Sequence, residues 1–265
     1  MPQVVAHRGS NEEEPEHSLA AYLRAVEEGA GAVECDVRLT ADGTLVCVHD
    51  RRIDRTSTGR GALSRLSLAQ LLAHDFSGPR TTWRDFESPP LDHTRTGVLT
   101  LRTLMASLLD ASNQVGFAIE TKHPVRFGRY VEQSLVETLD YFGLARPRGA
   151  SRVRVMSFST LALRRIRRMA PLLPRVLLME FIPPWRRDGS LPTGVGIAGV
   201  SIERVRDDPG YVGRVRSQGG LVHVWTVDDP ADVDLCVSLG VEAIISNRPA
   251  MVRARLASRH SVSGQ

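Results

Sequence analysis

Two acidic residues on one expected strand carry the most unusual chemistry in this sequence. Residues 32–37 read Ala-Val-Glu-Cys-Asp-Val. Because side chains alternate along a strand, Glu34 and Asp36 share one face of it. Two neighbouring carboxylates repel each other and lose hydration in apolar surroundings. A bound cation removes this penalty, and oxygen ligands suit Mg²⁺ or Ca²⁺. The alternative is a half-buried hairpin in which both carboxylates face solvent.

A candidate proton-transfer group follows this strand closely. Asp42-Gly43 predicts a tight turn that reverses the chain into a second short strand over 45–50. This strand ends at His49, whose imidazole titrates near neutral pH. The hairpin therefore predicts two metal ligands and one acid/base group in a short stretch of chain.

Length and composition are those of a globular α/β protein. The 265 residues are 42% apolar and 24% charged, and they match the usual size of a single α/β barrel. No apolar run approaches the roughly 20 residues that span a bilayer. No signal peptide is visible, so we expect a cytoplasmic protein. The three cysteines, Cys35, Cys47 and Cys236, lie in apolar segments without metal-ligand spacing, which predicts buried free thiols.

The charge pattern gives no support for a nucleic-acid partner. The net charge is +4, but aromatic residues make up only 5% of the chain and do not interleave with the arginine-rich stretches. A solvated helix face is the better interpretation of the arginines at 164–168. Lys122 is the only lysine, all other cationic side chains being arginine. One compact ammonium group in such a chain suggests a site that needs the shape of lysine.

Strand and helix patterns alternate along most of the chain. The predicted strands are 3–7, 32–37, 115–122, 153–158, 175–179, 199–202, 221–227 and 241–246. The predicted helices are 18–28, 100–109, 127–142, 161–169, 208–218, 231–239 and 250–257. Eight strands in βα alternation predict a TIM barrel, an α/β fold. The sequence lacks a Gly-x-Gly-x-x-Gly after the first strand, which weakens a dinucleotide-binding interpretation.

One stretch interrupts this alternation. Residues 51–98 are rich in Pro, Gly, Thr and Arg, with one helical candidate at 67–75. We interpret 51–98 as a small loop-rich insertion after the second strand. The expected organisation is a single barrel domain over 1–257, followed by a disordered tail over 258–265.

Polar residues gather where the predicted strands end. The active site of a TIM barrel lies at the C-terminal ends of its strands. Each residue alone has an ordinary structural explanation, since a histidine at a strand end is commonly only hydrogen-bonded, but together they indicate a functional site. The set is His7, Arg8, Glu34, Asp36, His49, Glu120, Lys122 and Trp225.

This set suits the cleavage of a phosphodiester. A divalent ion held by Glu34, Asp36 and Glu120 would neutralise a phosphate oxygen. Arg8 and Lys122 would offset the charge that grows on phosphorus. Two histidines could exchange protons with the nucleophile and the leaving alkoxide.

The motifs resemble the glycerophosphodiester phosphodiesterase family, within the phospholipase C-like phosphodiesterase superfamily. They occur in the family's order over nearly the whole chain: His7-Arg8-Gly9, Pro15-Glu16-His17-Ser18, Glu34-Cys35-Asp36-Val37, Asp42-Gly43 with His49-Asp50, Arg55-Thr56-Ser57-Thr58-Gly59, Glu120-Thr121-Lys122, Ser157-Phe158 and Val224-Trp225-Thr226-Val227.

The resemblance implies a TIM barrel with an inserted subdomain that hydrolyses glycerophosphodiesters to glycerol 3-phosphate and an alcohol, using Mg²⁺ or Ca²⁺. By similarity, the acid/base pair is His7 and His49, and the metal ligands are Glu34, Asp36 and Glu120. The residues implied to bind substrate are Arg8 and Lys122 at the phosphate and Trp225 at the glycerol end.

Several positions depart from the family pattern. The usual Pro-Glu-Asn-Thr reads Pro15-Glu16-His17-Ser18, so an imidazole replaces an amide. We favour a helix-capping neighbour that keeps the hydrogen bonds over a third catalytic histidine. The usual proline is absent from Leu99-Thr100-Leu101, and Ser246-Asn247 stands where Thr-Asp or Thr-Asn is common. No implied catalytic group is lost, so these departures bear on the substrate rather than the reaction.

Two alternatives stay open. The same fold could cleave lysophospholipids in a phospholipase D-like reaction, which needs an apolar entrance. The insertion offers Trp83, Phe86, Leu91 and Val98 for this purpose. The other alternative is a catalytically silent phosphodiester-binding module, although loss of catalysis normally leaves at least one of these polar residues substituted.

Overall fold

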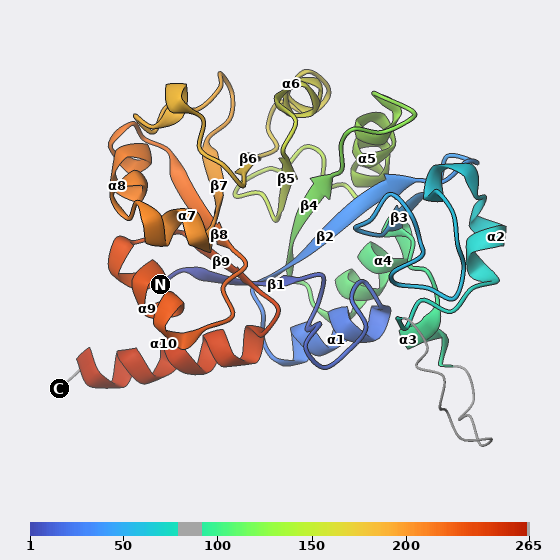
Figure 1. Ribbon diagram of the computed structural model, residues 1–265, viewed down its shortest axis with the longest axis horizontal. Helices are drawn as coiled ribbons and strands as arrows, with labels where there is room; N and C mark the ends of the chain where they lie inside the picture. Colours follow the sequence, from blue (N-terminus) through green and yellow to red (C-terminus); the bar gives the residue numbers. More distant parts are fainter. Residues whose placement is uncertain (79–91, 264–265) are drawn as a thin grey trace.

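Eight parallel strands form a closed barrel, with one short antiparallel strand at its edge (Figure 1). The computed structural model describes residues 1–78 and 92–263. The sheet order is β1-β9-β8-β7-β6-β5-β4-β2-β3, and a β1–β2 pairing closes it. The predicted TIM barrel is therefore confirmed. The barrel strands are β1 Gln3–His7, β2 Ala32–Leu39, β4 Gly116–Thr121, β5 Val153–Ser157, β6 Arg175–Met179, β7 Ile197–Ser201, β8 Leu221–Trp225 and β9 Ala243–Ser246; β3 is Leu45–Cys47.

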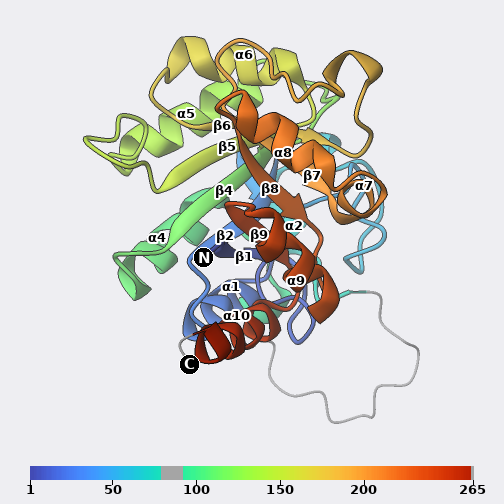
Figure 2. The ribbon, with the colours of Figure 1, turned by 90° about the vertical axis from the view of Figure 1, so that its left-hand side faces the viewer.

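The longer helices surround the strands, as a side view shows (Figure 2). They are α1 Leu19–Glu27, α4 Leu101–Ala111, α5 Tyr130–Tyr141, α6 Thr160–Met169, α7 Ile202–Asp207, α8 Gly210–Ser217, α9 Pro230–Leu239 and α10 Pro249–Ser263. Hydroxyl or carboxylate N-caps begin four of them, at Ser18, Thr100, Ser159 and Asp229. The short helix α7 was not predicted. In the part of the chain that the structure describes, no helix is both long and apolar enough to cross a membrane.

The inner face of the barrel changes from apolar to polar along each site-bearing strand. Alternation places Ala32 deep in the barrel and Glu34 and Asp36 progressively nearer the rim. On β4, Ala118 occupies the apolar layer and Glu120 the next inward position. The barrel core thus ends in a polar layer at the C-terminal end of its strands.

Strand register then fixes which of these polar residues are neighbours. His7 on β1 pairs with Glu34 on β2, and Asp36 on β2 pairs with Glu120 on β4. Four of the predicted site residues therefore lie on three adjacent strands. The three cysteines are buried free thiols, as predicted.

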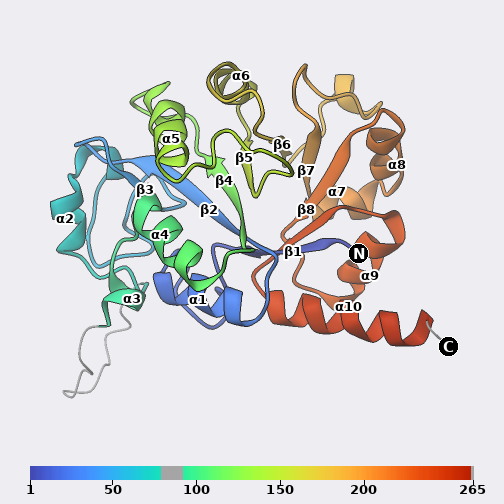
Figure 3. The same ribbon diagram turned by 180° about the vertical axis from the view of Figure 1, so that it is seen from behind.

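The insertion lies at one side of the barrel, beyond β2 and β4, and opposite α7–α9 (Figures 1 and 3). Its described part contains η1 Leu63–Arg65, α2 Leu68–Leu72 and α3 His93–Thr96. It has a small apolar cluster that includes Ile53, Leu63, Leu71 and Phe76. The predicted helix at 67–75 is shorter than expected, with Ser67 and Gln70 forming a capping box.

The lysophospholipid alternative needs an apolar entrance, for which the insertion offers few candidates. Val98 is buried in the insertion's own cluster and does not line the cavity at the C-terminal end of the barrel. Trp83, Phe86 and Leu91 lie outside the described residues.

The C-terminal helix is longer than predicted. α10 continues to Ser263, whereas the sequence predicted a helix over 250–257 and a disordered tail from Ser258. No glycine or proline occurs between Ala250 and Ser263 to end the helix. Arg255 and Arg259 also pair with Asp234 on α9, which anchors the last turns. Another helix of the chain, η2 Pro184–Arg186, follows β6.

Candidate active site

Three buried carboxylates meet at the C-terminal end of β2 and β4. Glu34, Asp36 and Glu120 each offer an oxygen, and these oxygens lie within 4.8 Å of one another. The exposed fractions of the three residues are 2%, 1% and 6%. The structure therefore brings together the three residues predicted to be metal ligands.

The electrostatics of this trio fit a divalent cation. Burial and the neighbouring Asp36 raise the pKa of Glu120 to about 8. The same two causes raise the pKa of Glu34 well above its usual value. Both carboxyl groups thus resist ionisation as long as no cation compensates the cluster. Three hard oxygen donors in this arrangement are the donor set that Mg²⁺ or Ca²⁺ prefers.

Asp36 is the member of the trio that stays ionised. Its Oδ1 lies 3.0 Å from Lys122 Nζ, and its Oδ2 lies 3.0 Å from His17 Nε2 and 3.2 Å from Arg8 Nε. Burial acts to raise the pKa of Asp36, but the His17 hydrogen bond and the Lys122 charge hold it well below its usual range. The two predicted phosphate-binding cations therefore flank the acidic trio.

Arg8 and Lys122 are held by carboxylates on both sides. Lys122 Nζ also lies 3.0 Å from Glu120 Oε1. The pKa of Lys122 is raised: burial opposes its charge, and Asp36 and Glu120 more than compensate. Arg8 has a left-handed backbone (φ +56°), its N–H donates to Glu34 Oε2 at 3.1 Å, and its Nη1 donates to Glu16 at 3.2 Å. Both cations are thus fixed beside the trio, Lys122 buried and Arg8 partly buried.

His7 is oriented by a hydrogen-bond chain from the last barrel strand. Its Nδ1 lies 2.7 Å from Asn247 Oδ1, which also accepts from Asn11, while Asn247 Nδ2 donates to Asp228. Because the amide oxygen can only accept, His7 Nδ1 carries the proton. His7 Nε2 is left as the free nitrogen, 4.0 Å from Glu34 Oε2.

His49 is oriented in the same way by its sequence neighbour. Its Nδ1 lies 2.7 Å from Asp50 Oδ1, and Asp50 in turn accepts from Arg55 Nε. Burial acts to raise the pKa of Asp50, but Arg55 lowers it, so this carboxylate stays ionised and accepts a hydrogen bond from His49 Nδ1–H. Arg55 also binds Glu16, and this ties the insertion to the loop after β1. Among the described residues, Nε2 of each predicted acid/base histidine therefore makes no hydrogen bond.

Neither histidine favours the charged form in the free protein. Burial, followed by the Arg8 charge, lowers the pKa of His7 to about 4. Burial also lowers the pKa of His49. A negatively charged ligand beside either ring would offset these effects and favour protonation.

A cavity of about 320 Å³ opens above these residues. Trp225 lines its far wall and packs edge-to-face against Phe158, with ring centroids 5.7 Å apart. All predicted site residues except Asp36 line the cavity, and Asp36 lies just beneath. The lining residues are His7, Arg8, Glu34, His49, Glu120, Lys122, Met156, Phe158, Leu178, Glu180, Trp225, Thr226 and Ile245.

The model of the glycerophosphoryl diester phosphodiesterase family matches residues 7–251. The chain belongs to this family. The match covers every residue of the site described above.

Relatives with assigned names agree with this membership. The family member named "Probable glycerophosphodiester phosphodiesterase 1" from Mycobacterium tuberculosis is 47% identical over 259 residues, which is 96% of this chain and 92% of the relative. The glycerophosphodiester phosphodiesterase of Bacillus subtilis is 27% identical, over 93% of this chain and 83% of the relative. The protein is thus an enzyme of the phosphodiesterase class.

Solved structures of the family share the fold. A phosphodiesterase from Oleispira antarctica, solved in complex with the product sn-glycerol-3-phosphate, matches with a TM-score of 0.78 at 23% identity, covering 97% of each chain. A family member from Parabacteroides distasonis matches with a TM-score of 0.79 at 23% identity, covering 98% of each chain.

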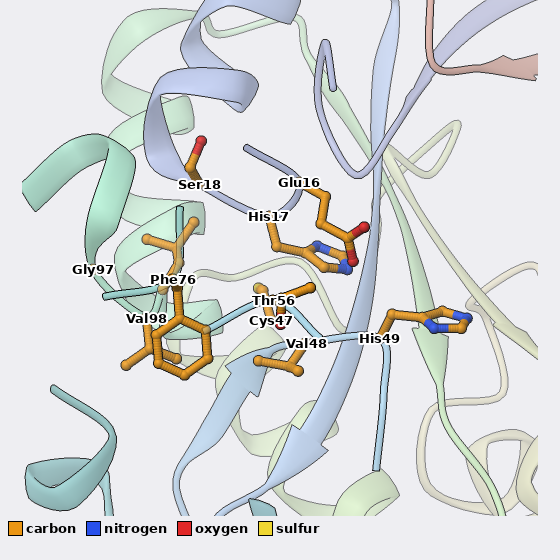
Figure 4. Close-up of a pocket in the computed structure, with 11 residues that line it drawn as sticks. Glu16, His17, Ser18, Cys47, Val48, His49, Thr56, Phe76, Gly97 and Val98 are labelled. Carbon is orange, nitrogen blue, oxygen red and sulfur yellow. The ribbon is translucent and has the colours of Figure 1, made fainter. Parts of the chain in front are cut away.

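His17, one of the departures from the family pattern, is part of the site rather than only a neighbour of the helix cap. It is buried and left-handed (φ +61°), and its ring bridges Asp36 and Tyr22 with hydrogen bonds of 3.0 and 2.7 Å. Tyr22 also donates to the Glu34 carbonyl. As favoured from the sequence, His17 keeps hydrogen bonds, but they reach a predicted metal ligand. A separate small pocket lies beside His17 and is lined by Glu16, Ser18 and residues of the insertion. Figure 4 shows the His17 ring beside Glu16 in this pocket, while the His49 ring points away from it.

Asn247 and Asp228 are the residues that sequence analysis missed as site components. The Ser246-Asn247 departure was noticed, but its effect on the site was not. The position of Ser246-Asn247 at the end of the last strand could have indicated a role in the site, because barrel closure brings β9 beside β1.

Proposed function

We propose that this family member hydrolyses glycerophosphodiesters to sn-glycerol 3-phosphate and an alcohol, with a divalent cation held by Glu34, Asp36 and Glu120. The observation that carries the proposal is the buried carboxylate trio flanked by Arg8 and Lys122. The carboxylates can bind a metal ion, and the two adjacent cationic side chains can bind the phosphodiester beside it. The product in the Oleispira antarctica structure belongs to that relative and supports the choice of substrate.

When bound, Mg²⁺ or Ca²⁺ would supply Lewis-acid stabilisation of a phosphate oxygen and could acidify a hydroxyl group. The chain's own cations act on the other phosphate oxygens. Lys122, buried and held at its raised pKa, presents a compact positive charge, while Arg8 presents a planar fork of donors. Together they offset the charge that develops on phosphorus.

His7 and His49 form the proposed acid/base pair. Each ring has its Nδ1 occupied, by Asn247 or by Asp50, so each offers Nε2 for proton transfer. The anionic phosphodiester raises the pKa of a histidine beside it, and one ring is then protonated as the general acid. The other ring stays neutral and removes a proton from the hydroxyl group that attacks phosphorus.

Trp225 and Phe158 wall the cavity opposite the charged residues. In this proposal the uncharged glycerol end of the substrate packs against this wall, and we place the leaving alcohol on the side of His49. His49 is then the general acid and His7 the general base.

The proposal is tested by incubating the purified protein with glycerophosphoglycerol and measuring the release of sn-glycerol 3-phosphate. We expect turnover with Mg²⁺ or Ca²⁺ and loss of turnover after chelation, restored by adding the ion. Glu34→Gln should abolish turnover while thermal unfolding shows a folded barrel. Full activity in excess chelator would contradict the metal site, and no turnover with either ion would contradict the activity.

A lysophospholipid substrate is the second candidate, and one observation favours it. Phe158, which follows β5, lines the cavity and is 45% exposed, and Phe181 and Trp185 in the segment after β6 are 61% and 74% exposed. An acyl chain could pack on such apolar surface. Hydrolysis of lysophosphatidylcholine at a rate comparable to that of glycerophosphoglycerol would favour this candidate. The cytoplasmic location expected from the sequence stays a prediction.

A further inference from the structure

Four arginines surround a second cavity beside the proposed active site. This cavity measures about 480 Å³, a size typical of ligand pockets. Arg38, Arg51, Arg52 and Arg126 line it, together with Ser64 and residues 124–127. No carboxylate belongs to its lining among the described residues. We refer to it as the arginine cavity.

Most of this positive charge has no internal partner. Arg52 pairs with Asp54 at 2.9 Å. For Arg51 and Arg126, no carboxylate lies within ion-pair distance in the described ranges 1–78 and 92–263. Arg126 makes a long contact of 3.5 Å to the Ser64 carbonyl and lies 5.5 Å from the centre of the Phe127 ring, so neither of its neighbours carries a negative charge. Guanidinium groups that share one cavity repel each other, and a bound anion converts this repulsion into attraction.

The arginine cavity adjoins the active site at His49, although no described residue lines both cavities. Arg38 lines the cavity, and its Nη2 and Nε donate to the His49 carbonyl at 2.7 and 2.9 Å. Arg51 follows His49 by two residues, and the loop 124–127 follows Lys122 directly. Two parts of the cavity lining, Arg51 and the loop 124–127, are therefore close in sequence to active-site residues, and Arg38 contacts the backbone of His49.

From this placement we propose that the arginine cavity binds a second phosphate group, carried by the leaving alcohol of the substrate. The inference rests on the proposed function, in which the alcohol lies on the side of His49. Guanidinium groups bind phosphate oxygens in pairs, and Ser64 can add a hydroxyl donor. The preferred substrate class is then a glycerophosphodiester whose alcohol is itself phosphorylated, not one with a neutral or cationic alcohol.

Two matched substrates test the inference. The first is glycerophosphoglycerol, and the second is the same compound with a phosphate monoester on its far glycerol. Hydrogen bonds between charged groups are typically worth about 1.5–3 kcal/mol, which corresponds to roughly tenfold or more in kcat/KM. We expect the wild-type protein to prefer the phosphorylated compound by about this factor, and less at high salt.

The double variant Arg51→Gln/Arg126→Gln should lose that preference and keep its kcat/KM for glycerophosphoglycerol. Both side chains are exposed, so thermal unfolding should stay unchanged. The control is Arg168→Gln, an exposed arginine in the last turn of α6, at the far end of the barrel. It should leave both rates and their ratio unchanged.

A preference that persists in the double variant, or a wild type without any preference, would overturn the inference while the proposed function stands. A wild type that turns over neither compound would overturn the proposed function instead, and the inference with it.

Discussion

The two halves of the barrel contribute differently to the cavity. The charged half comprises β1, β2, the β3 hairpin and β4, and it supplies the histidines, the carboxylate trio, Arg8 and Lys122. The apolar half comprises β5–β9, and its cavity residues are mainly Met156, Phe158, Leu178, Trp225 and Ile245. Glu180 is the charged exception on that side.

This division matches a substrate with one charged centre and one uncharged end. Buried carboxylates and cations compensate each other only when they are close, so strand register must gather them on adjacent strands. The apolar half lines the rest of the cavity and adds few charges to it. Under the proposed function, the charged half carries out the reaction and the apolar half fits the uncharged end of the substrate.

The largest expected effect comes from the two histidines of the charged half. His7→Ala and His49→Ala should each reduce kcat by about 10²–10⁴-fold, the usual contribution of general acid–base catalysis. Because the pair acts as a unit, the double variant should lose little more than either single variant. Rate measurements on the three variants check this. Losses that multiply would show that the two rings do not act as a pair.

Lys122→Arg tests whether the positive charge of residue 122 is sufficient for activity or whether the shape of lysine is also required. The guanidinium is planar and larger than the ammonium, and it cannot fit between Asp36 and Glu120 as a point charge. We expect a loss of about tenfold or more in kcat/KM, less than the 10²–10³-fold typical of removing a donor outright. Lys122→Met provides that comparison. A rate for Lys122→Arg within about twofold of wild type would mean that the shape of lysine is not required.

Asn247→Ala tests whether the two halves are independent, because Asn247 belongs to the apolar half but orients His7 in the charged half. Its hydrogen bond supports the charged form of His7, so its removal should lower the His7 pKa below about 4. We expect about tenfold lower kcat/KM and an acidic limb of the pH profile displaced to lower pH. An unchanged profile would show that the Asn247 contact has no catalytic effect.

Trp225→Ala should have the smallest effect and should act on binding. Loss of about 1 kcal/mol of apolar contact raises KM by roughly fivefold, with kcat nearly unchanged. Trp185→Ala is the matched control, since Trp185 is exposed and does not line the cavity. A large loss of kcat for Trp225→Ala would place chemistry in the apolar half as well.

The charged half was the more predictable from sequence. Alternation along 32–37 placed Glu34 and Asp36 on one face, and βα alternation identified the barrel that aims them inward. The Asp42-Gly43 hairpin returned His49 to the same rim. These signals are local, so a single sequence carries them.

The contacts that orient the site were harder to predict because they depend on tertiary structure. The hydrogen bond from His7 to Asn247 joins residues 240 positions apart and exists only in the closed barrel. His17 reaches Asp36 through a left-handed backbone, a conformation that few non-glycine residues adopt and that a single sequence does not reveal. The extension of α10 depends in part on ion pairs to Asp234.

Calorimetric titration of Mg²⁺ and Ca²⁺ tests most directly whether the carboxylate trio is a metal site. We predict one ion per chain, bound more tightly as pH rises toward about 8, where Glu120 loses its proton. The sign follows because the ion binds the ionised carboxylates and therefore releases protons from the raised-pKa groups Glu34 and Glu120. Glu34→Gln should abolish the binding heat. An unchanged affinity in Glu34→Gln, or no binding to the wild type, would contradict the account.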